Sequence, residues 1–342
     1  MPNVHDAPDQ PVDVPTVAFD LPARLGLDHP LVNAPMAGAA GGALAGAVST
    51  AGGLGLIGIG STATKEWISE QATLARAPGR AWGAGLMAWV LERSLDPLHE
   101  ILDHGPSLVS VSFGDPGPAA ALIRESGALC AMQVGNDADL QRALEPDIDV
   151  VVCRGGEGGG HGRNDVATLP LLQQALAATS KPVIAAGGIA DARGVAAVLA
   201  AGAQAAWIGT RFAASTESSS HDLVKQAIAA AELDDTIFTR VFDIAQRIPW
   251  PTEFGGRALR NDFTEQWAQD GEGLVDALAK DPSITETIKA ARTHADVSTA
   301  PVYAGQSVSR TAGQEGAADI VAELAGFRTH LGTAAARWSR GR

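Results

Sequence analysis

Short apolar runs alternate with helical patterns along most of the chain, beginning at Leu31. This alternation is typical of parallel β/α units, in which a helix follows each strand and returns the chain. Eight strands are expected, at the runs Leu31–Ala34, Leu54–Ile59, Ala81–Met87, Leu108–Phe113, Ala128–Val134 and Ile148–Cys153 and at two runs that end at Gly187 and Gly209. Eight parallel strands with helices between them close into a barrel more readily than they form an open sheet. The pattern therefore predicts an α/β protein built as a (β/α)8 barrel of the TIM type.

This rhythm breaks between residues 218 and 300. The stretch is richer in charge, contains the sequence Pro249, Trp250, Pro251, and shows helical patterns near 222–231, 263–269 and 283–293. We expect a small helical insertion after the eighth strand, packed as a lid over the barrel mouth. The barrel then comprises residues 21–217 and 301–342, and residues 1–20 are expected to form a disordered arm.

Composition narrows the range of partners. A formal net charge of −14 repels phosphate backbones and anionic lipid surfaces, so neither nucleic acid nor a membrane is an expected partner. The N-terminal stretch lacks the positive charge and apolar run of a secretory signal, which favours a cytoplasmic protein. Cys130 and Cys153 lie in apolar runs and fit reduced core thiols, and no C-x-x-C or H-x-x-H spacing supports a metal site.

The most conspicuous candidate for chemistry is His161, in the stretch DVVVCRGGEGGGHGR at residues 149–163. An apolar strand ends there, and ligands of parallel β/α proteins collect beyond the carboxyl ends of the strands. Histidine titrates near neutral pH, which suits a general base or a donor to an anionic substrate. The competing interpretation is a solvated loop histidine. Glu157 either orients this loop or the imidazole, or is a solvated carboxylate.

Glycines also end the seventh and eighth predicted strands, at Gly187 and Gly188 and at Gly209 followed by Thr210. Barrels commonly build a phosphate site from backbone N–H groups at this place, although turn glycines are the simpler interpretation. Gln133 ends another apolar strand, where its amide could bond the edge of a heterocycle or nearby backbone.

Five motifs carry a family resemblance: APMAG at 34–38, GGEGGGHG at 155–162, AAGGI at 185–189, IGTRF at 208–212 and AGQS at 304–307. In this order and spacing they resemble the nitronate monooxygenases, formerly called 2-nitropropane dioxygenases. These are FMN-containing barrels with a helical insertion after the eighth strand. The resemblance covers about residues 21–326.

The resemblance implies a role for each matching residue. It implies that His161 is catalytic, that Ala34, Pro35 and Met36 line the flavin, and that Gln133 bonds its ring. It further implies that the FMN phosphate is held by Gly187, Gly188, Gly209 and Thr210, and that the remaining cofactor contacts are Gly159, Gly305 and Gln306. One departure concerns the third strand, where Gly85 stands in place of the asparagine usual in the family.

The reaction implied by the resemblance is the oxidation of alkyl nitronates with O2 to carbonyl compounds and nitrite. Neutral nitroalkanes become substrates if His161, acting alone, removes their proton. One alternative is an NADH-dependent FMN reductase of the same wider family, acting on quinones or on enoyl-acyl carrier protein, and a remote one is a non-catalytic flavin-binding protein. We expect Trp89, Phe113, Trp250 and Phe254 to shape the pocket. The physiological substrate, the use of NAD(P)H and the assembly stay open, with a homodimer as one option.

Overall fold

The computed structural model describes residues 17–76 and 80–339. Eight parallel strands form its central sheet, in the order β1-β9-β8-β6-β5-β4-β3-β2. A parallel bridge between Val32 and Leu54 joins the two ends of this sheet, so the strands surround a closed barrel. This confirms the predicted fold, and the strands are β1 (Leu31–Asn33), β2 (Gly55–Gly58), β3 (Trp82–Met87), β4 (Leu108–Ser112), β5 (Leu129–Val134), β6 (Val150–Arg154), β8 (Val183–Ala186) and β9 (Ala205–Ile208).

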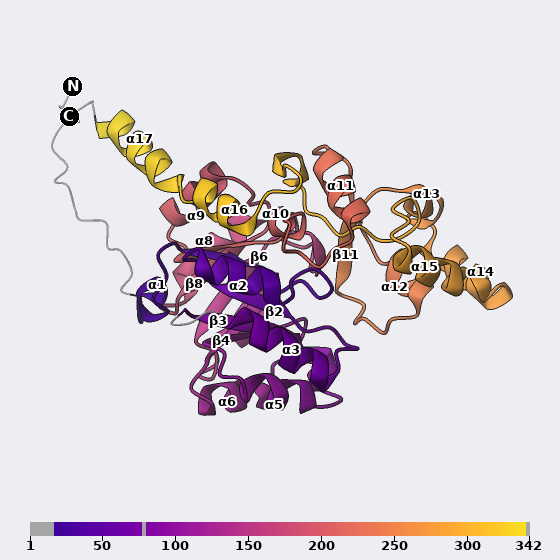
Figure 1. Cartoon of the computed structure of the whole chain (residues 1–342), viewed down its shortest axis with the longest axis horizontal. Helices are drawn as coiled ribbons and strands as arrows, with labels where there is room; N and C mark the ends of the chain where they lie inside the picture. The colour runs from indigo at the N-terminus through magenta and orange to yellow at the C-terminus, as the bar shows by residue number, and fades with distance from the viewer. Residues whose placement is uncertain (1–16, 77–79, 340–342) are drawn as a thin grey trace, which may run out of the picture.

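Helices cover the outside of the barrel (Figure 1). Several begin where the sequence offers a capping side chain, as at Thr64, Asn136 and Asp191, each of which accepts a hydrogen bond from a backbone N–H of the first turn. The helices around the barrel are α1 (Leu21–Arg24), α2 (Gly42–Thr50), α3 (Lys65–Ala75), α4 (Ala88–Leu91), α5 (Asp96–Leu102), α6 (Pro118–Glu125), α7 (Asp137–Ala143), α8 (Thr168–Ala178), α9 (Ala192–Ala200), α10 (Thr210–Ala213), α16 (Ala317–Leu324) and α17 (Phe327–Ser339).

The barrel strands are buried on both faces. Alternate residues point inward and form one core, which includes Val32, Leu108, Val152 and Trp207. Their neighbours point outward and pack against the helices, as Val109 and Val151 do. This double burial explains why the strands consist of nearly continuous apolar runs. Both cysteines are free and buried, and burial raises the pKa of the Cys153 thiol to about 12.

The segment after β9 forms a separate group of elements at one side of the barrel, coloured orange in Figure 1. It contains strands as well as helices, which the sequence analysis did not anticipate. β10 and β11 pair with each other, and β11 also pairs with β7, which carries His161. The elements of this segment are α11 (Asp222–Ala230), β10 (Thr236–Thr239), α12 (Val241–Gln246), β11 (Gly255–Leu259), α13 (Asp262–Trp267), α14 (Gly271–Lys280), α15 (Ser283–Thr293) and the 3-10 turn η1 (Val308–Arg310). The strand β7 (Gly160–Gly162) lies between β6 and α8 in the chain.

The expected disordered arm, residues 1–20, lies mostly outside the described residues. Its last part is attached to the barrel, because the Ala18 N–H donates to the Ser180 carbonyl and the Gln204 side chain donates to the Phe19 carbonyl. Within the described ranges, no helix combines the length and the apolar character needed to cross a membrane.

Candidate active site

His161 lies on the short strand β7, between the barrel and the inserted segment. It faces Gly256 of β11, while Gly160 and Gly162 face Arg257 and Gly255. A Cβ atom at residue 256 would lie 2.8 Å from Cε1 of Tyr303 and 3.6 Å from Cε1 of His161. Glycine at this position therefore leaves room for both rings.

The imidazole of His161 is paired with a carboxylate from the insertion. Its Nε2 lies 2.9 Å from Oδ1 of Asp243, which belongs to α12 and is 82 residues away in the sequence. The two side chains are 10% and 3% exposed, respectively. The sequence analysis treated His161 as unaided, and the structure corrects this with a buried hydrogen-bonded partner.

Aromatic rings surround this pair. Trp250 stacks on the imidazole with ring centroids 3.8 Å apart and planes inclined by 4°, and Tyr303 lies 5.1 Å away at a tilt of 55°. Trp250 also contacts Trp89 and Phe113, and Phe113 contacts Phe254. The four aromatic residues expected to shape the pocket therefore form one cluster with His161. Burial, and the nearby carboxylate of Asp243, raise the pKa of Tyr303, so its hydroxyl stays protonated at neutral pH.

A buried guanidinium holds the glycine-rich loop in place. Arg154, 4% exposed at the end of β6, donates to the carbonyls of Arg163 at 2.8 Å and Gly158 at 2.6 Å, and also to those of Gly159 and Gly160. Burial, together with nearby Arg257, lowers the pKa of Arg154 to about 10, so it remains charged at neutral pH. Steric contact with this guanidinium explains why glycine stands in the loop, since a Cβ at residue 158 would lie 2.7 Å from Nε of Arg154.

Glu157 orients the loop and is not a solvated carboxylate. Its Oε2 accepts from both the N–H of Thr168, at 3.0 Å, and the Thr168 hydroxyl, at 2.9 Å. The same Thr168 Oγ1 lies 3.0 Å from the carbonyl oxygen of Gly187 at the end of β8, so the two acceptors share its single hydrogen. Glu157 therefore connects the His161 loop to the first residue of α8 and to the strand ends of the barrel.

Three groups of predicted site residues, 34–36, 187–188 and 209–210, lie at the carboxyl ends of β1, β8 and β9. Gly187 and Gly188 have φ angles of 104° and 69°, a region that favours glycine. A Cβ at Gly209 would lie 3.6 Å from both the Ala34 Cβ and the Met36 Sδ, so the ends of β9 and β1 are in close contact. The sequence motifs at these three strand ends thus form one surface of the barrel mouth.

The segment 304–306 closes this surface from the other side. The Gly305 N–H donates to Oγ1 of Thr210 at 2.9 Å, and the Gln306 N–H donates to the Glu157 carbonyl at 2.9 Å. A Cβ at Gly159 would lie 2.6 Å from the nitrogen of Gly305. Gly305 therefore links the His161 loop, through a close backbone approach, to the Thr210 hydroxyl at the end of β9.

Free backbone donors at the barrel mouth allow a test of whether a phosphate-bearing cofactor fits. Within residues 17–76 and 80–339, the N–H groups of Gly188, Gly209 and Thr210 donate to no protein acceptor. Backbone N–H groups without side chains in the way are suited to phosphate oxygens. The residues present therefore fit a phosphate group.

Gly85 has a structural explanation. A Cβ at residue 85 would collide with the ring of Pro35, so Pro35 occupies the space that a side chain on β3 would need. The neighbouring strand β2 approaches the same segment as closely, since a Cβ at Gly58 would collide with backbone atoms of Pro35 and Met36. Gln133, at the end of β5, is half-buried, and its side chain forms no hydrogen bond with the described residues.

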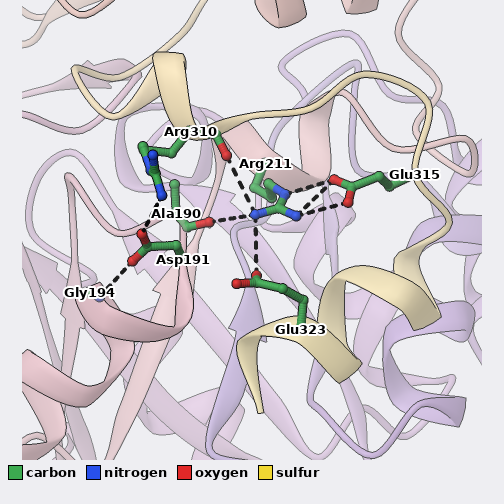
Figure 2. Close-up of polar contacts among 7 residues, drawn as sticks. All are labelled: Ala190, Asp191, Gly194, Arg211, Arg310, Glu315 and Glu323. Atoms are coloured by element: carbon green, nitrogen blue, oxygen red, sulfur yellow. Dashed lines mark hydrogen bonds and ion pairs between the residues drawn. The ribbon is translucent and has the colours of Figure 1, made fainter. Parts of the chain in front are cut away.

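Next to Thr210, Arg211 fastens the C-terminal segment to the barrel (Figure 2). Its guanidinium, 6% exposed, donates to both carboxylate oxygens of Glu315 at 3.0 Å, to Glu323 at 3.3 Å and to the Ala190 carbonyl at 2.9 Å. Arg310 adds an ion pair with Asp191, at 3.2 Å. These contacts fix the chain that follows the 304–306 segment.

Sequence reasoning missed Asp243, Tyr303 and Arg154 as parts of the site. Asp243 is a single acidic residue in the segment VFDIAQ, and nothing in its surroundings marks it as a partner of His161. Arg154 directly follows the apolar β6 run and is the one of the three with a signal, because a charged residue joined to a buried strand needs internal partners.

Comparisons with known proteins show the family of the chain. The family model described as "Nitronate monooxygenase" matches residues 86–326. A "(3aS,4S,5R,7aS)-5-hydroxy-7a-methyl-1-oxo-octahydro-1H-indene-4-carboxyl-CoA dehydrogenase" of Mycobacterium tuberculosis is 32% identical over 64% of this chain and 62% of that protein, so the chain spans less than two thirds of that relative. A nitronate monooxygenase of Paraburkholderia phytofirmans is 31% identical over 70% of this chain and 76% of that protein.

Solved structures are similar over almost the whole chain. FabK from Thermotoga maritima has a TM-score of 0.76 and 26% identity, covering 94% of this chain and 100% of that one. Nitroalkane oxidase from Streptomyces ansochromogenes has a TM-score of 0.74 and 30% identity, covering 90% of this chain and 99% of that one.

Proposed function

The chain belongs to the nitronate monooxygenase family, and on that premise we propose that it uses FMN to oxidise alkyl nitronates with O2. The products are a carbonyl compound and nitrite. The observation that carries this proposal is the backbone contact between Gly159, in the His161 loop, and Gly305, which bonds Thr210. Through this contact the loop that carries His161 lies beside the surface of free N–H donors.

In this proposal FMN binds in the barrel mouth, between the His161 loop and the free N–H groups at the ends of β8 and β9. The N–H groups of Gly188, Gly209 and Thr210 hold the FMN phosphate, and Ala34, Pro35 and Met36 line the flavin. Gln133, whose side-chain amide forms no hydrogen bond with the described residues, bonds the flavin ring. Bound FMN supplies the electron-accepting group, and the protein supplies orientation and electrostatics.

His161 handles the proton. A neutral nitroalkane must lose a C–H proton before it can be oxidised, and His161 accepts it as a general base. A preformed nitronate has already lost this proton and needs no base. The aromatic cluster of Trp250, Phe113 and Phe254 limits the access of water to this exchange.

The test is anaerobic mixing of the FMN-loaded protein with propyl nitronate in one cuvette and with NADH in another, while flavin absorbance is followed at about 450 nm. Loss of absorbance with nitronate alone supports the proposed oxidation. Loss of absorbance with NADH alone contradicts it and favours a reductase.

A second candidate is an FMN-dependent oxidoreductase that acts on a coenzyme A thioester. Relatives from Mycobacterium tuberculosis and Rhodococcus jostii, each 32% identical over the matched residues, are named carboxyl-CoA dehydrogenases. Beside the aromatic cluster lies a cavity of about 330 Å³ lined by Trp89, Arg93, Ser61 and Ser94 among others. In this second candidate, the coenzyme A part of a long substrate binds in this cavity. Inhibition of nitronate turnover by free coenzyme A would favour the thioester, and no inhibition would favour a small nitronate.

A further inference from the structure

We propose that Asp243 is a positioning residue that keeps the proton of His161 on Nε2, so that Nδ1 is the atom that receives the substrate proton. Trp250, from the same insertion, fixes the plane of the ring. The inference rests on the proposed function and makes the inserted segment a working part of the active site.

The tautomer follows from the chemistry of the pair. An ionised carboxylate only accepts hydrogen bonds, so the 2.9 Å contact with Oδ1 of Asp243 requires a hydrogen on Nε2. A neutral imidazole carries one hydrogen, which leaves Nδ1 with a free lone pair. Among the described residues, Nδ1 has no hydrogen-bond partner that would compete with a substrate.

The ring is also held against rotation. Trp250 covers one face at 3.8 Å with nearly parallel planes, and Tyr303 packs beside the ring at 5.1 Å. Below the ring, the pairing of His161 with Gly256 fixes the backbone. Rotation that exchanged the two nitrogen atoms would break the Asp243 bond in a buried place, where an unpaired polar group is costly.

Among residues 17–76 and 80–339, no other charged group bonds the imidazole. Tyr303 is uncharged at neutral pH, because burial and Asp243 raise its pKa, and Arg292 of α15 donates to Gln246. Arg154 donates to the carbonyls of the loop. Asp243 is therefore the one carboxylate that bonds His161 within the described residues.

The proton transfer can be written in full. The C–H bond of a neutral nitroalkane breaks, its proton forms an N–H bond at Nδ1, and the electron pair moves into the nitro group to give the nitronate. The imidazole becomes a cation with both nitrogen atoms protonated, and the carboxylate of Asp243 stabilises that charge. A preformed nitronate needs no such step.

The experiment combines nitrogen-15 NMR of histidine-labelled FMN-loaded protein with kinetics of Asp243→Asn and Asp243→Glu. The chain has eight histidines, and the signal of His161 is identified by its loss in His161→Asn. We expect the Nε2-protonated tautomer in the unmodified protein and a mixture in Asp243→Asn, because an amide can donate or accept. For neutral nitroalkane, kcat/KM of Asp243→Asn should fall about a hundredfold, with nitronate changed less than about threefold and partial recovery in Asp243→Glu.

The outcomes separate the two proposals. An Nδ1-protonated tautomer in the unmodified protein, or equal losses on both substrates with an unchanged tautomer, overturns the positioning role. Absence of turnover with either substrate overturns the proposed function, while the NMR tautomer still tests the positioning. If Asp243→Asn does not fold, the tautomer of the unmodified protein and the kinetics of Asp243→Glu decide.

Discussion

The two sides of the barrel mouth are built in different ways. The β8 and β9 side consists of backbone, with glycines at the strand ends and free N–H groups. The His161 side consists of side chains that come from distant segments, namely Arg154 of β6, Asp243 of α12 and Trp250 after it. Substitutions on the first side should affect cofactor affinity, whereas substitutions on the second should affect proton transfer.

The largest effect is expected for His161→Asn. Turnover of neutral nitroalkane should fall about 10²- to 10⁴-fold, because the general base is lost, while preformed nitronate is affected far less and FMN stays bound. Steady-state kinetics on both substrates and flavin absorbance after gel filtration measure this. Equal losses on both substrates would exclude His161 as the base. Loss of FMN would show that the His161 side also determines cofactor affinity, which contradicts the division between the two sides of the mouth.

Arg154→Met should destabilise the protein by about 3–5 kcal/mol, since it removes the donor for the loop carbonyls of Gly158, Gly159, Gly160 and Arg163 in a buried place. Urea unfolding followed by tryptophan fluorescence gives this value. The matched control is Arg142→Met, which breaks the exposed ion pair with Asp115 and should cost at most about 1 kcal/mol. Similar costs for both variants would mean that Arg154 does not hold the loop.

Gly188→Ala tests the backbone side. Its φ of 69° makes a side chain unfavourable, and the added Cβ stands where the phosphate is proposed to bind, so the FMN Kd should rise about tenfold. Gly127→Ala is the control, because Gly127 has a φ of 88°, is exposed and has open space around it. Both variants should lose stability, and only Gly188→Ala should lose FMN affinity in a fluorescence titration. Equal FMN affinities would move the phosphate away from this strand end.

The smallest effect is expected for Trp250→Leu. Without the stacked indole, the imidazole of His161 can tilt away from its position for proton transfer. The value of kcat/KM for neutral nitroalkane should fall about two- to tenfold, which corresponds to the interaction free energy of one aromatic pair. Trp338→Leu, at a tryptophan that is 82% exposed on α17, should leave activity unchanged. A loss equal to that of His161→Asn would show that Trp250 does more than support the ring.

Much of the fold was predictable because its signals are local. All eight barrel strands coincide with apolar runs of the sequence, and helix α15 falls where the 283–293 pattern indicated. Strands β10 and β11 were missed, since β10 has four residues and β11 has two glycines among its five, and such short segments carry no clear period of alternation. β11 also pairs with β7, which lies far earlier in the chain.

The candidate site divides in the same way. The glycine pairs at Gly187 and Gly209 could be found from the sequence, because a backbone site is made by consecutive residues at the end of a strand. Glu157 had two possible roles, and only its bonds to Thr168 decided between them. Gly85 was read as a lost contact, and the structure shows the ring of Pro35 in the space of the missing side chain.

By itself, the sequence determined the barrel, the order of its strands along the chain and the position of His161 at a strand end, because apolar periodicity and glycine placement act over a few residues. Only the tertiary structure decided that Asp243 bonds Nε2, that Trp250 covers the ring and that Arg154 fills the glycine loop. The Arg154 contacts are short in sequence and depend on how the glycine loop turns back over its own strand. The contacts of Asp243 and Trp250 with His161 join distant parts of the chain, and they depend on how the inserted segment docks through β11 onto β7. The free energy of such docking comes from burial of side chains that no local pattern brings together.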